Sequence, residues 1–211
     1  MMRSYVKPLV FVLSLTPLAV LAVRLFLNAL GANPIEAITN QTGLWTLRFL
    51  LLALIATPLK RATGWGWPIR LRRMLGLFSF FYVTLHLSSY VWLDQFFDWG
   101  EIGRDIMKRP FITVGMLAFT LLVPLAATST NAMVRRLGRS WKKLHRLAYL
   151  IPALGVVHFW WLVKADTREP FVYACLLAVL LLLRTPPMQV VTARVSGLLS
   201  GVARRRALQD V

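Results

Sequence analysis

Cysteine and charged side chains are scarce in this sequence. One cysteine, Cys175, excludes an intramolecular disulfide and with it the disulfide-stabilised secreted scaffolds. Only 16% of the 211 residues are charged, against roughly 25% in a soluble domain, whereas 57% are hydrophobic. With a mean hydropathy of +0.62, this composition excludes disordered, collagen-like and ordinary soluble chains. It leaves a membrane protein that crosses the bilayer several times.

Acidic residues are rarer still, which leaves a large excess of positive charge. Asp and Glu number 8 against 25 Lys and Arg, so the formal net charge is +17. Such an excess can indicate nucleic-acid binding, but here the basic residues stand at the ends of apolar runs and no motif for nucleic-acid binding accompanies them. We therefore expect no nucleic-acid partner. The charge is assigned to loops that orient the chain and contact anionic membrane lipid.

Six long apolar runs dominate the sequence, and one helical crossing of a bilayer needs about 20 residues. They predict an all-α fold, a polytopic membrane bundle of six transmembrane helices that forms a single domain over residues 1–211. The expected helices cover residues 8–30, 44–59, 74–93, 111–127, 147–163 and 171–183. No internal repeat is evident.

The loops between the runs alternate in charge. Loops 60–73 and 128–146 carry basic residues without acids, whereas loop 94–110 carries four of the eight acids. The positive-inside rule then places both basic loops and both termini in the cytoplasm. In this orientation 18 of the 25 basic residues lie inside and seven of the eight acids outside, the exception being Asp210. Loop 94–110 also holds apolar residues and is expected to form an amphipathic helix on the outer surface.

Two of the three histidines lie inside apolar runs, where an ionisable side chain is costly and indicates function. His86 lies twelve residues beyond the start of the third run and His158 eleven beyond the start of the fifth. Both predicted helices run outward, so the two imidazoles are expected at nearly the same depth. Two facing imidazoles suit the two axial positions of a haem iron in a helix bundle. The alternative is that each histidine makes a hydrogen bond between helices.

The neighbours of these two histidines are consistent with a haem site. Gly155 lies three residues before His158 on the same helix face, where it is expected to leave clearance for a flat macrocycle. Ser89 and Tyr90 follow His86 by three and four residues and are expected to orient the imidazole or the haem edge.

The third histidine, His145, lies thirteen residues before His158, which is roughly 20 Å along an ideal helix. This separation suggests a second haem stacked across the bilayer, so one or two haems are expected. Against a second haem, thirteen residues leave the two side chains about 140° apart around the helix, and the third run has no second histidine near Arg72 and Arg73. The alternative is a solvated histidine at the membrane interface.

Other chemistry lacks the residues it needs. A zinc site takes three or four ligands, and no Ser–His–Asp or Cys–His arrangement is visible, so no catalytic residue is expected. Arg24 and Arg48 lie within or near the ends of apolar runs. They either extend to the lipid headgroups or pair with haem propionates.

Several segments resemble the MsrQ family, also called YedZ, whose members are haem-binding membrane subunits of a bacterial methionine sulfoxide reductase system. The family belongs to the ferric-reductase-like transmembrane group. The matching segments are Arg70–Leu77, Leu85–Tyr90, Arg109–Gly115 and Thr128–His145, with shorter stretches at Leu30–Pro34 and Thr57–Leu59. His86 and His158 match the family's haem ligands, and His145 matches its third histidine.

The resemblance implies a b-type cytochrome in the bacterial inner membrane. It would pass electrons to a periplasmic molybdenum-cofactor reductase, MsrP, which repairs methionine sulfoxide in periplasmic proteins. The implied donor is the quinone pool or a cytosolic flavin reductase, and the implied cofactors are haem b and FMN.

Two other functions stay open at this point. One is a stand-alone ferric-reductase-like transmembrane oxidoreductase, which the lack of a nicotinamide domain disfavours. The other is a non-redox membrane scaffold or transporter, which would need more polar groups through the bundle than the apolar runs contain. We expect the electron-transfer subunit of an enzyme, with no substrate pocket of its own.

Overall fold

A computed structural model of the chain describes residues 5–163 and 165–185, and within these ranges every regular element is a helix. The all-α prediction is confirmed. In chain order the elements are α1 (Val6–Phe26), α2 (Pro34–Thr63), α3 (Trp67–Ser88), the π-helix η1 (Ser89–Asp94), α4 (Trp99–Lys108), α5 (Pro110–Ala127), α6 (Asn131–Leu137), α7 (Arg139–Leu144), α8 (Leu147–Leu162) and α9 (Arg168–Leu182).

Four helices are long and apolar enough to cross a membrane. They are α1, α2, α5 and the continuous helix formed by α3 and η1, residues Trp67–Asp94. The other two predicted runs correspond to α8 and α9, which have 16 and 15 residues and fall short of the roughly 20 of a usual crossing. The order of apolar helices thus follows the prediction, and four crossings are supported.

The helix bounds differ from the prediction where capping residues, rather than hydrophobicity, set them. α1 ends at Phe26 instead of residue 30, because Asn28 adopts a left-handed φ of 52°. α2 begins at Pro34 instead of residue 44. There the Asn33 side chain accepts a hydrogen bond from the Glu36 N–H at 3.2 Å, and proline occupies the first helical position.

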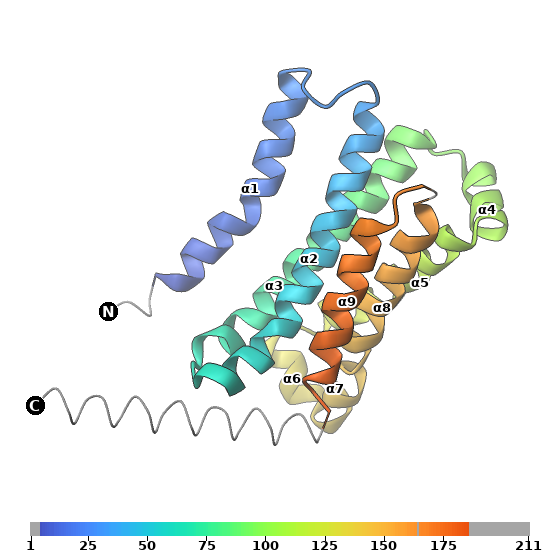
Figure 1. The fold of residues 1–211 in the computed structure, drawn as a ribbon. Helices are drawn as coiled ribbons and strands as arrows, with labels where there is room; N and C mark the ends of the chain where they lie inside the picture. The colour runs from blue at the N-terminus through green and yellow to red at the C-terminus, as the bar shows by residue number, and fades with distance from the viewer. Residues whose placement is uncertain (1–4, 164, 186–211) are drawn as a thin grey trace, which may run out of the picture.

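Four helices, α2, α3, α5 and α8, form a ring at the centre of the molecule, and their arrangement can be followed in Figure 1. α2 pairs with α3, and α5 pairs with α8, as two antiparallel hairpins. Because α3 also contacts α5 and α2 contacts α8, the ring closes in the order α2, α3, α5, α8. α3 and α8 are therefore diagonal to each other. α1 packs outside α2 and α3, α9 packs outside α2 and α8, and α4 packs against α5.

Three groups of buried apolar side chains fill this bundle. Their members are Leu47, Leu51, Leu54, Val156, Tyr173, Leu177 and Leu180; Leu50, Leu122, Leu125 and Ile151; and Phe49, Phe78 and Tyr82.

Tyr82 fastens α1 to the ring. Its side chain is almost fully buried, and its hydroxyl donates to the Ser14 carbonyl at 2.9 Å and accepts from the Leu18 N–H at 3.2 Å. These two backbone groups would otherwise bond to each other within α1, so the phenol is inserted into the helix next to Pro17. Ser14 is also the one buried residue among the described residues of α1. The attachment of α1 therefore depends on few contacts.

A second helix proline, Pro58 in α2, explains the position of Arg184 just after α9. The Leu54 carbonyl would normally accept from the N–H of residue 58, which proline lacks. Arg184 Nη2 donates to that carbonyl at 2.6 Å, and Nη1 donates to the Tyr149 hydroxyl at 2.9 Å. The arginine thus connects the end of α9 to α2 and α8.

Arg184→Met is expected to lower the stability of the purified protein by about 1–3 kcal/mol, because the buried Leu54 carbonyl loses a donor. Thermal unfolding in detergent, followed by circular dichroism, measures the loss. In a Pro58→Ala background the new N–H can bond the Leu54 carbonyl, so the same substitution should cost clearly less. Equal costs in the two backgrounds would show that the contact to this carbonyl contributes nothing.

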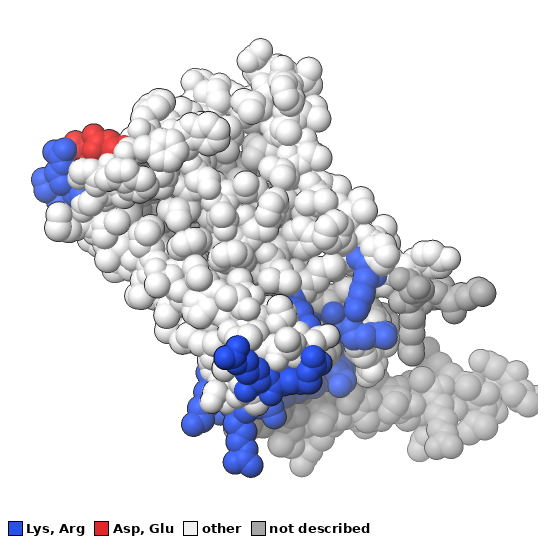
Figure 2. Space-filling view, turned by 180° about the vertical axis from the view of Figure 1, so that it is seen from behind, with Lys and Arg blue, Asp and Glu red and all other residues white. Residues whose placement is uncertain are grey.

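Basic side chains gather at one end of the bundle (Figure 2). This is the end where α2 turns into α3 and where α6 and α7 connect α5 to α8. Arg73, from the first basic loop, donates to the side chain of Asn131 at 2.6 Å. The prediction that loops 60–73 and 128–146 lie on the same side of the molecule is therefore confirmed.

Candidate haem site

His86 and His158 come from the diagonal helices of the ring and meet inside it. His86 lies on α3 and His158 on α8, and their ring centroids are 6.1 Å apart with an angle of 81° between the ring planes. The prediction that the two imidazoles face each other at one depth is thus matched by the geometry.

The separation of the rings fits one iron between them. With nitrogen–metal distances of about 2.0–2.1 Å and a ring centre about 1.1 Å beyond the nitrogen, two imidazoles on opposite sides of one iron have centroids about 6.3 Å apart. The observed distance of 6.1 Å is close to this value. Within the described residues no cluster of three His, Cys, Asp or Glu side chains could hold a metal ion directly. The geometry therefore suits axial ligation of a haem rather than a bare ion.

Each imidazole is oriented by a backbone carbonyl on the neighbouring helix. His86 Nδ1 donates to the Thr39 carbonyl at 2.8 Å, and His158 Nδ1 donates to the Phe111 carbonyl at 2.6 Å. A carbonyl oxygen can only accept, so each Nδ1 carries the proton and each Nε2 keeps its lone pair. This tautomer is the one that binds a metal, and an Nδ1–H bond to a carbonyl is the usual support for a ligating histidine.

Two glycines make room for these hydrogen bonds. In a helix the carbonyl of one residue points toward the residue four positions later, and here those residues are Gly43 and Gly115. A Cβ on Gly43 would lie 3.1 Å from His86 Nδ1, and one on Gly115 would lie 2.8 Å from His158 Nδ1. Gly155, which the sequence suggested as clearance for a macrocycle, does not take part in these hydrogen bonds: a Cβ there would meet Leu47 at 3.6 Å, an ordinary contact. Its role in leaving room for a macrocycle stays a prediction.

The surroundings of the two histidines repeat along the chain. Thr39, Gly43 and His86 each have a counterpart 72 positions later, in Phe111, Gly115 and His158. The α2–α3 hairpin and the α5–α8 hairpin therefore carry the same carbonyl–glycine–histidine arrangement, although no repeat was predicted. The signal that could have revealed it is the spacing of 43 residues from glycine to histidine in both hairpins.

Ser89 and Tyr90 do not bind the His86 imidazole, which was one of the two roles expected of them. Their hydroxyl groups bind other parts of the protein near the site. The Ser89 hydroxyl donates to the His86 carbonyl at 2.8 Å and lies 2.9 Å from the Thr39 hydroxyl. It thereby joins the helix that carries His86 to the residue whose carbonyl orients it. The Tyr90 hydroxyl donates to the Asp105 carboxylate at 2.9 Å, away from the imidazole.

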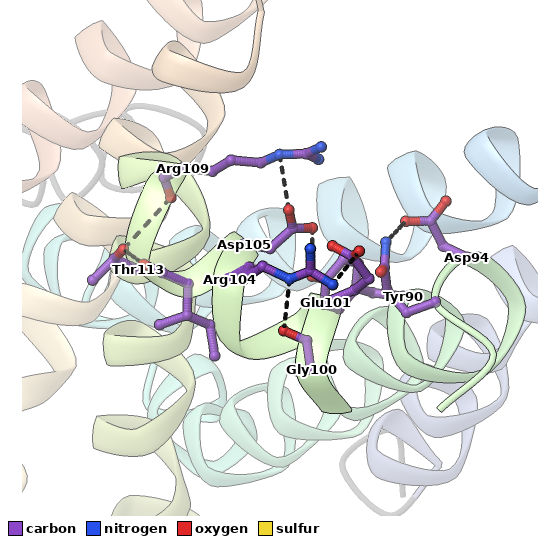
Figure 3. A network of polar contacts seen from close by, with 10 residues as sticks. Tyr90, Asp94, Gly100, Glu101, Arg104, Asp105, Arg109 and Thr113 are labelled. Carbon is purple, nitrogen blue, oxygen red and sulfur yellow. Dashed lines mark hydrogen bonds and ion pairs between the residues drawn. The ribbon is translucent and has the colours of Figure 1, made fainter. Parts of the chain in front are cut away.

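Asp105 is the centre of a polar network that fixes α4 to the bundle (Figure 3). Its side chain is buried, and besides Tyr90 it binds Arg109 at 3.0 Å. Arg109 directly precedes α5 and lies two residues before Phe111. The network therefore supports the first turn of α5, which supplies the carbonyl for His158. It also confirms that loop 94–110 contains a helix, with buried Ile102 facing the bundle.

His145 lies apart from this pair, in the turn before α8. Its Nε2 is 3.0 Å from the Thr128 hydroxyl, and the Trp141 ring stacks on it with centroids 3.9 Å apart. Burial, followed by the positive charges of Arg72 and Arg73, lowers the pKa of His145, so the neutral imidazole is favoured. Arg73 is also the residue 72 positions before His145, so the repeat supplies an arginine where a second ligand pair would need a histidine.

Arg48 and Arg24 have protein partners. Arg48, at the middle of α2, donates from Nε to the Tyr173 hydroxyl at 2.8 Å, and its Nη2 lies 3.9 Å from Glu169 in the first turn of α9. Arg24 donates to the Ala29 carbonyl at 3.0 Å. The choice between headgroups and haem propionates as further partners stays a prediction.

Comparison with known proteins agrees with the geometry. Residues 42–156, more than half of the chain, match the family model described as ferric reductase like transmembrane component. A protein-methionine-sulfoxide reductase heme-binding subunit MsrQ of Herminiimonas arsenicoxydans is 53% identical over 184 residues, which cover 86% of this chain and 84% of the relative. The chain belongs to the MsrQ family. The protein of the same name from Rhodospirillum rubrum is 56% identical over 179 residues, covering 84% of this chain and 86% of that one. No solved structure shows significant similarity to the chain.

Proposed function

We propose that the chain is the b-type cytochrome subunit of a methionine sulfoxide reductase system. It relays electrons from quinol or a reduced flavin to a periplasmic molybdenum-cofactor reductase, MsrP. The observation that carries the proposal is the His86–His158 pair, with centroids 6.1 Å apart and both Nδ1 atoms bound to carbonyls. The names of the relatives, heme-binding subunits, support the same conclusion.

The protein's task in this function is to hold the ligands while single electrons pass. A bound haem b would supply a one-electron carrier. Reduction of one methionine sulfoxide takes two electrons and two protons and releases water, so the subunit delivers two electrons in succession. Both imidazoles donate their Nδ1 protons to carbonyls, and among the described residues neither imidazole is hydrogen-bonded to a carboxylate. The pair therefore moves electrons without moving protons, and the protons are taken up at the partner.

The absorption spectrum of the purified protein tests this function. A strong low-spin Soret band that sharpens on reduction is expected for two imidazole ligands. A protein purified with intact helices and no haem absorption, even after supply of haem during expression, would contradict the proposal and favour a membrane scaffold.

We propose six membrane crossings, with both basic loops and both termini in the cytoplasm of an inner-membrane protein. α8 runs along α5, and α9 packs against α8 and α2, so the two short helices complete a bundle of which four members are already long enough to cross. The gathering of basic residues at one end supports the orientation. The C-terminal tail, with Arg194 and Asp210, lies outside the described residues.

Cysteine labelling in intact cells is expected to place Ser140 inside and Thr167 outside. Both residues are exposed, one at the basic end before α8 and the other just before α9 at the opposite end. After replacement of Cys175 by alanine, a membrane-impermeant maleimide should label Thr167→Cys and leave Ser140→Cys unlabelled until the membrane is broken. Labelling of Ser140→Cys in intact cells would reverse the orientation.

We propose one haem, between His86 and His158. A second haem at His145, suggested by its spacing from His158, and FMN, implied by the resemblance, stay predictions. A second haem at His145 would require the Thr128 hydroxyl to leave Nε2 and an axial partner from another residue. FMN would find cationic partners for its phosphate at the basic end of the bundle. Haem quantification per chain and fluorescence of flavin released on denaturation test the two predictions.

The family model favours one second candidate, direct reduction of a ferric chelate. The chemically reduced protein would then be reoxidised by a ferric chelate without any partner protein. Reoxidation only after MsrP is added supports the relay function instead.

A further inference from the structure

We infer that Gly43 and Gly115 are positioning residues that hold the two axial imidazoles in crossed planes, and that this crossing sets the electronic properties of the iron. The inference rests on the proposed function, because it takes His86 and His158 as the two ligands. It goes further by assigning a role to two residues of α2 and α5 that contact neither iron nor substrate.

The direction of each imidazole is set by its hydrogen bond. The Nδ1–H of His86 points at the Thr39 carbonyl on α2, and that of His158 points at the Phe111 carbonyl on α5. Both acceptors belong to helical backbone, which cannot rotate to follow the ring. A ring held at Nδ1 can change its plane only by tilting toward or away from the helix surface beside the acceptor.

The glycines determine how closely each ring lies on that surface. A Cβ on Gly115 would stand 2.8 Å from His158 Nδ1 and 3.0 Å from its Cε1, closer than real Cβ contacts. A Cβ on Gly43 would stand 3.1 Å from both Nδ1 and Cε1 of His86. Each imidazole therefore lies directly against helix backbone at a glycine. With His86 against α2 and His158 against α5, the angle between the two imidazole planes is 81°.

Crossed ligand planes have a defined electronic consequence. Each imidazole interacts with the iron dπ orbital perpendicular to its own ring plane. Parallel rings raise one dπ orbital above the other, whereas rings at nearly a right angle raise both alike. The two orbitals are then almost degenerate, which gives the ferric ion a highly anisotropic low-spin EPR signal. It also raises the reduction potential above that of the same site with parallel rings.

EPR of the purified ferric protein tests the inference, with Gly76→Ala as the matched control. Gly76 is also a helical glycine of the bundle, in α3, but it lies ten residues before His86 and its added Cβ would meet nothing within 4 Å. The wild type and Gly76→Ala should show the crossed-plane signal, with one g value far above those of parallel bis-imidazole haem. Gly115→Ala should lower that g value or abolish the low-spin signal, and Gly43→Ala should do so to a smaller extent. A redox titration should show the midpoint potential of each surviving signal moving with its g value.

Several outcomes would overturn the inference while leaving the haem function intact. One is a wild-type protein with a full low-spin absorption spectrum but an ordinary parallel-plane EPR signal. Another is Gly115→Ala and Gly43→Ala proteins that match Gly76→Ala in g values and potential. The wild-type measurement decides the ring geometry even where a glycine variant fails to fold. Absence of haem from the wild type would instead count against the proposed function.

Discussion

His86→Ala and His158→Ala proteins are each expected to lose essentially all low-spin haem absorption. Both rings are proposed to bind one iron from opposite sides, so removal of either leaves that iron one imidazole short. Haem content and the Soret and α bands of the purified proteins measure the effect. Circular dichroism should show that the helices are retained.

His145→Ala is the control for this pair. Its ring lies in the turn before α8, roughly 20 Å of helix rise from His158, and contacts Thr128 and Trp141. The low-spin signal should therefore persist. If His145→Ala abolished all haem while His86→Ala retained it, the pairing of His86 with His158 would be wrong. A partial loss in His145→Ala, together with more than one haem per chain in the wild type, would instead establish a second haem.

Electron transfer through the subunit is expected to require an added donor and the His86–His158 pair. In sealed vesicles with MsrP on the outer side, NADPH alone should leave the subunit oxidised. Quinol, or a flavin reductase with flavin and NADPH on the basic side, should support reduction of methionine sulfoxide. MsrP is placed on the outer side because the two imidazoles lie near the starts of α2 and α5, where Thr39 and Phe111 supply the carbonyls, at the end opposite the basic loops.

Vesicles containing the His86→Ala, His158→Ala double variant provide the control. Sulfoxide reduction should stop, while MsrP supplied directly with an artificial reductant keeps its activity. Equal turnover with this variant would show that the site between the two histidines is not on the electron path.

Local sequence patterns were sufficient to predict the apolar helices and the proximity of His86 and His158. Hydrophobic runs mark helices in a membrane chain, and an imidazole within such a run is rare enough to indicate function. The helix bounds were less predictable, because Asn33 and Pro34 start α2 through capping geometry rather than hydrophobicity. The all-α fold and the helix in loop 94–110 followed from the same kind of local pattern.

The groups that orient His86 and His158 could not be predicted from the sequence, because they belong to segments that are distant along the chain. The sequence drew attention to Gly155 because it precedes His158 on the same helix. The glycine that lies against the His158 ring is instead Gly115, on α5. The Nδ1 acceptors are likewise backbone carbonyls 47 residues away, which no side-chain pattern reports. Tyr90 was correctly noticed as polar and close to the site, yet its partner is Asp105 on α4.

The repeat of the two hairpins has a consequence for how the macrocycle enters the bundle. α2 and α5 run in one direction and α3 and α8 in the other, so a two-fold axis parallel to the helices exchanges His86 with His158. Haem b has a similar approximate axis in its own plane, through the iron and between the two propionates, which exchanges its faces while swapping methyl and vinyl groups. With both histidines bound to one iron, the ligands alone would not distinguish the two faces. The selection of one rotational isomer would then depend on side chains that break the repeat, as the buried Ser79 and its counterpart Ile151 do, and paired haem-methyl resonances in an NMR spectrum would indicate a mixture of the two isomers.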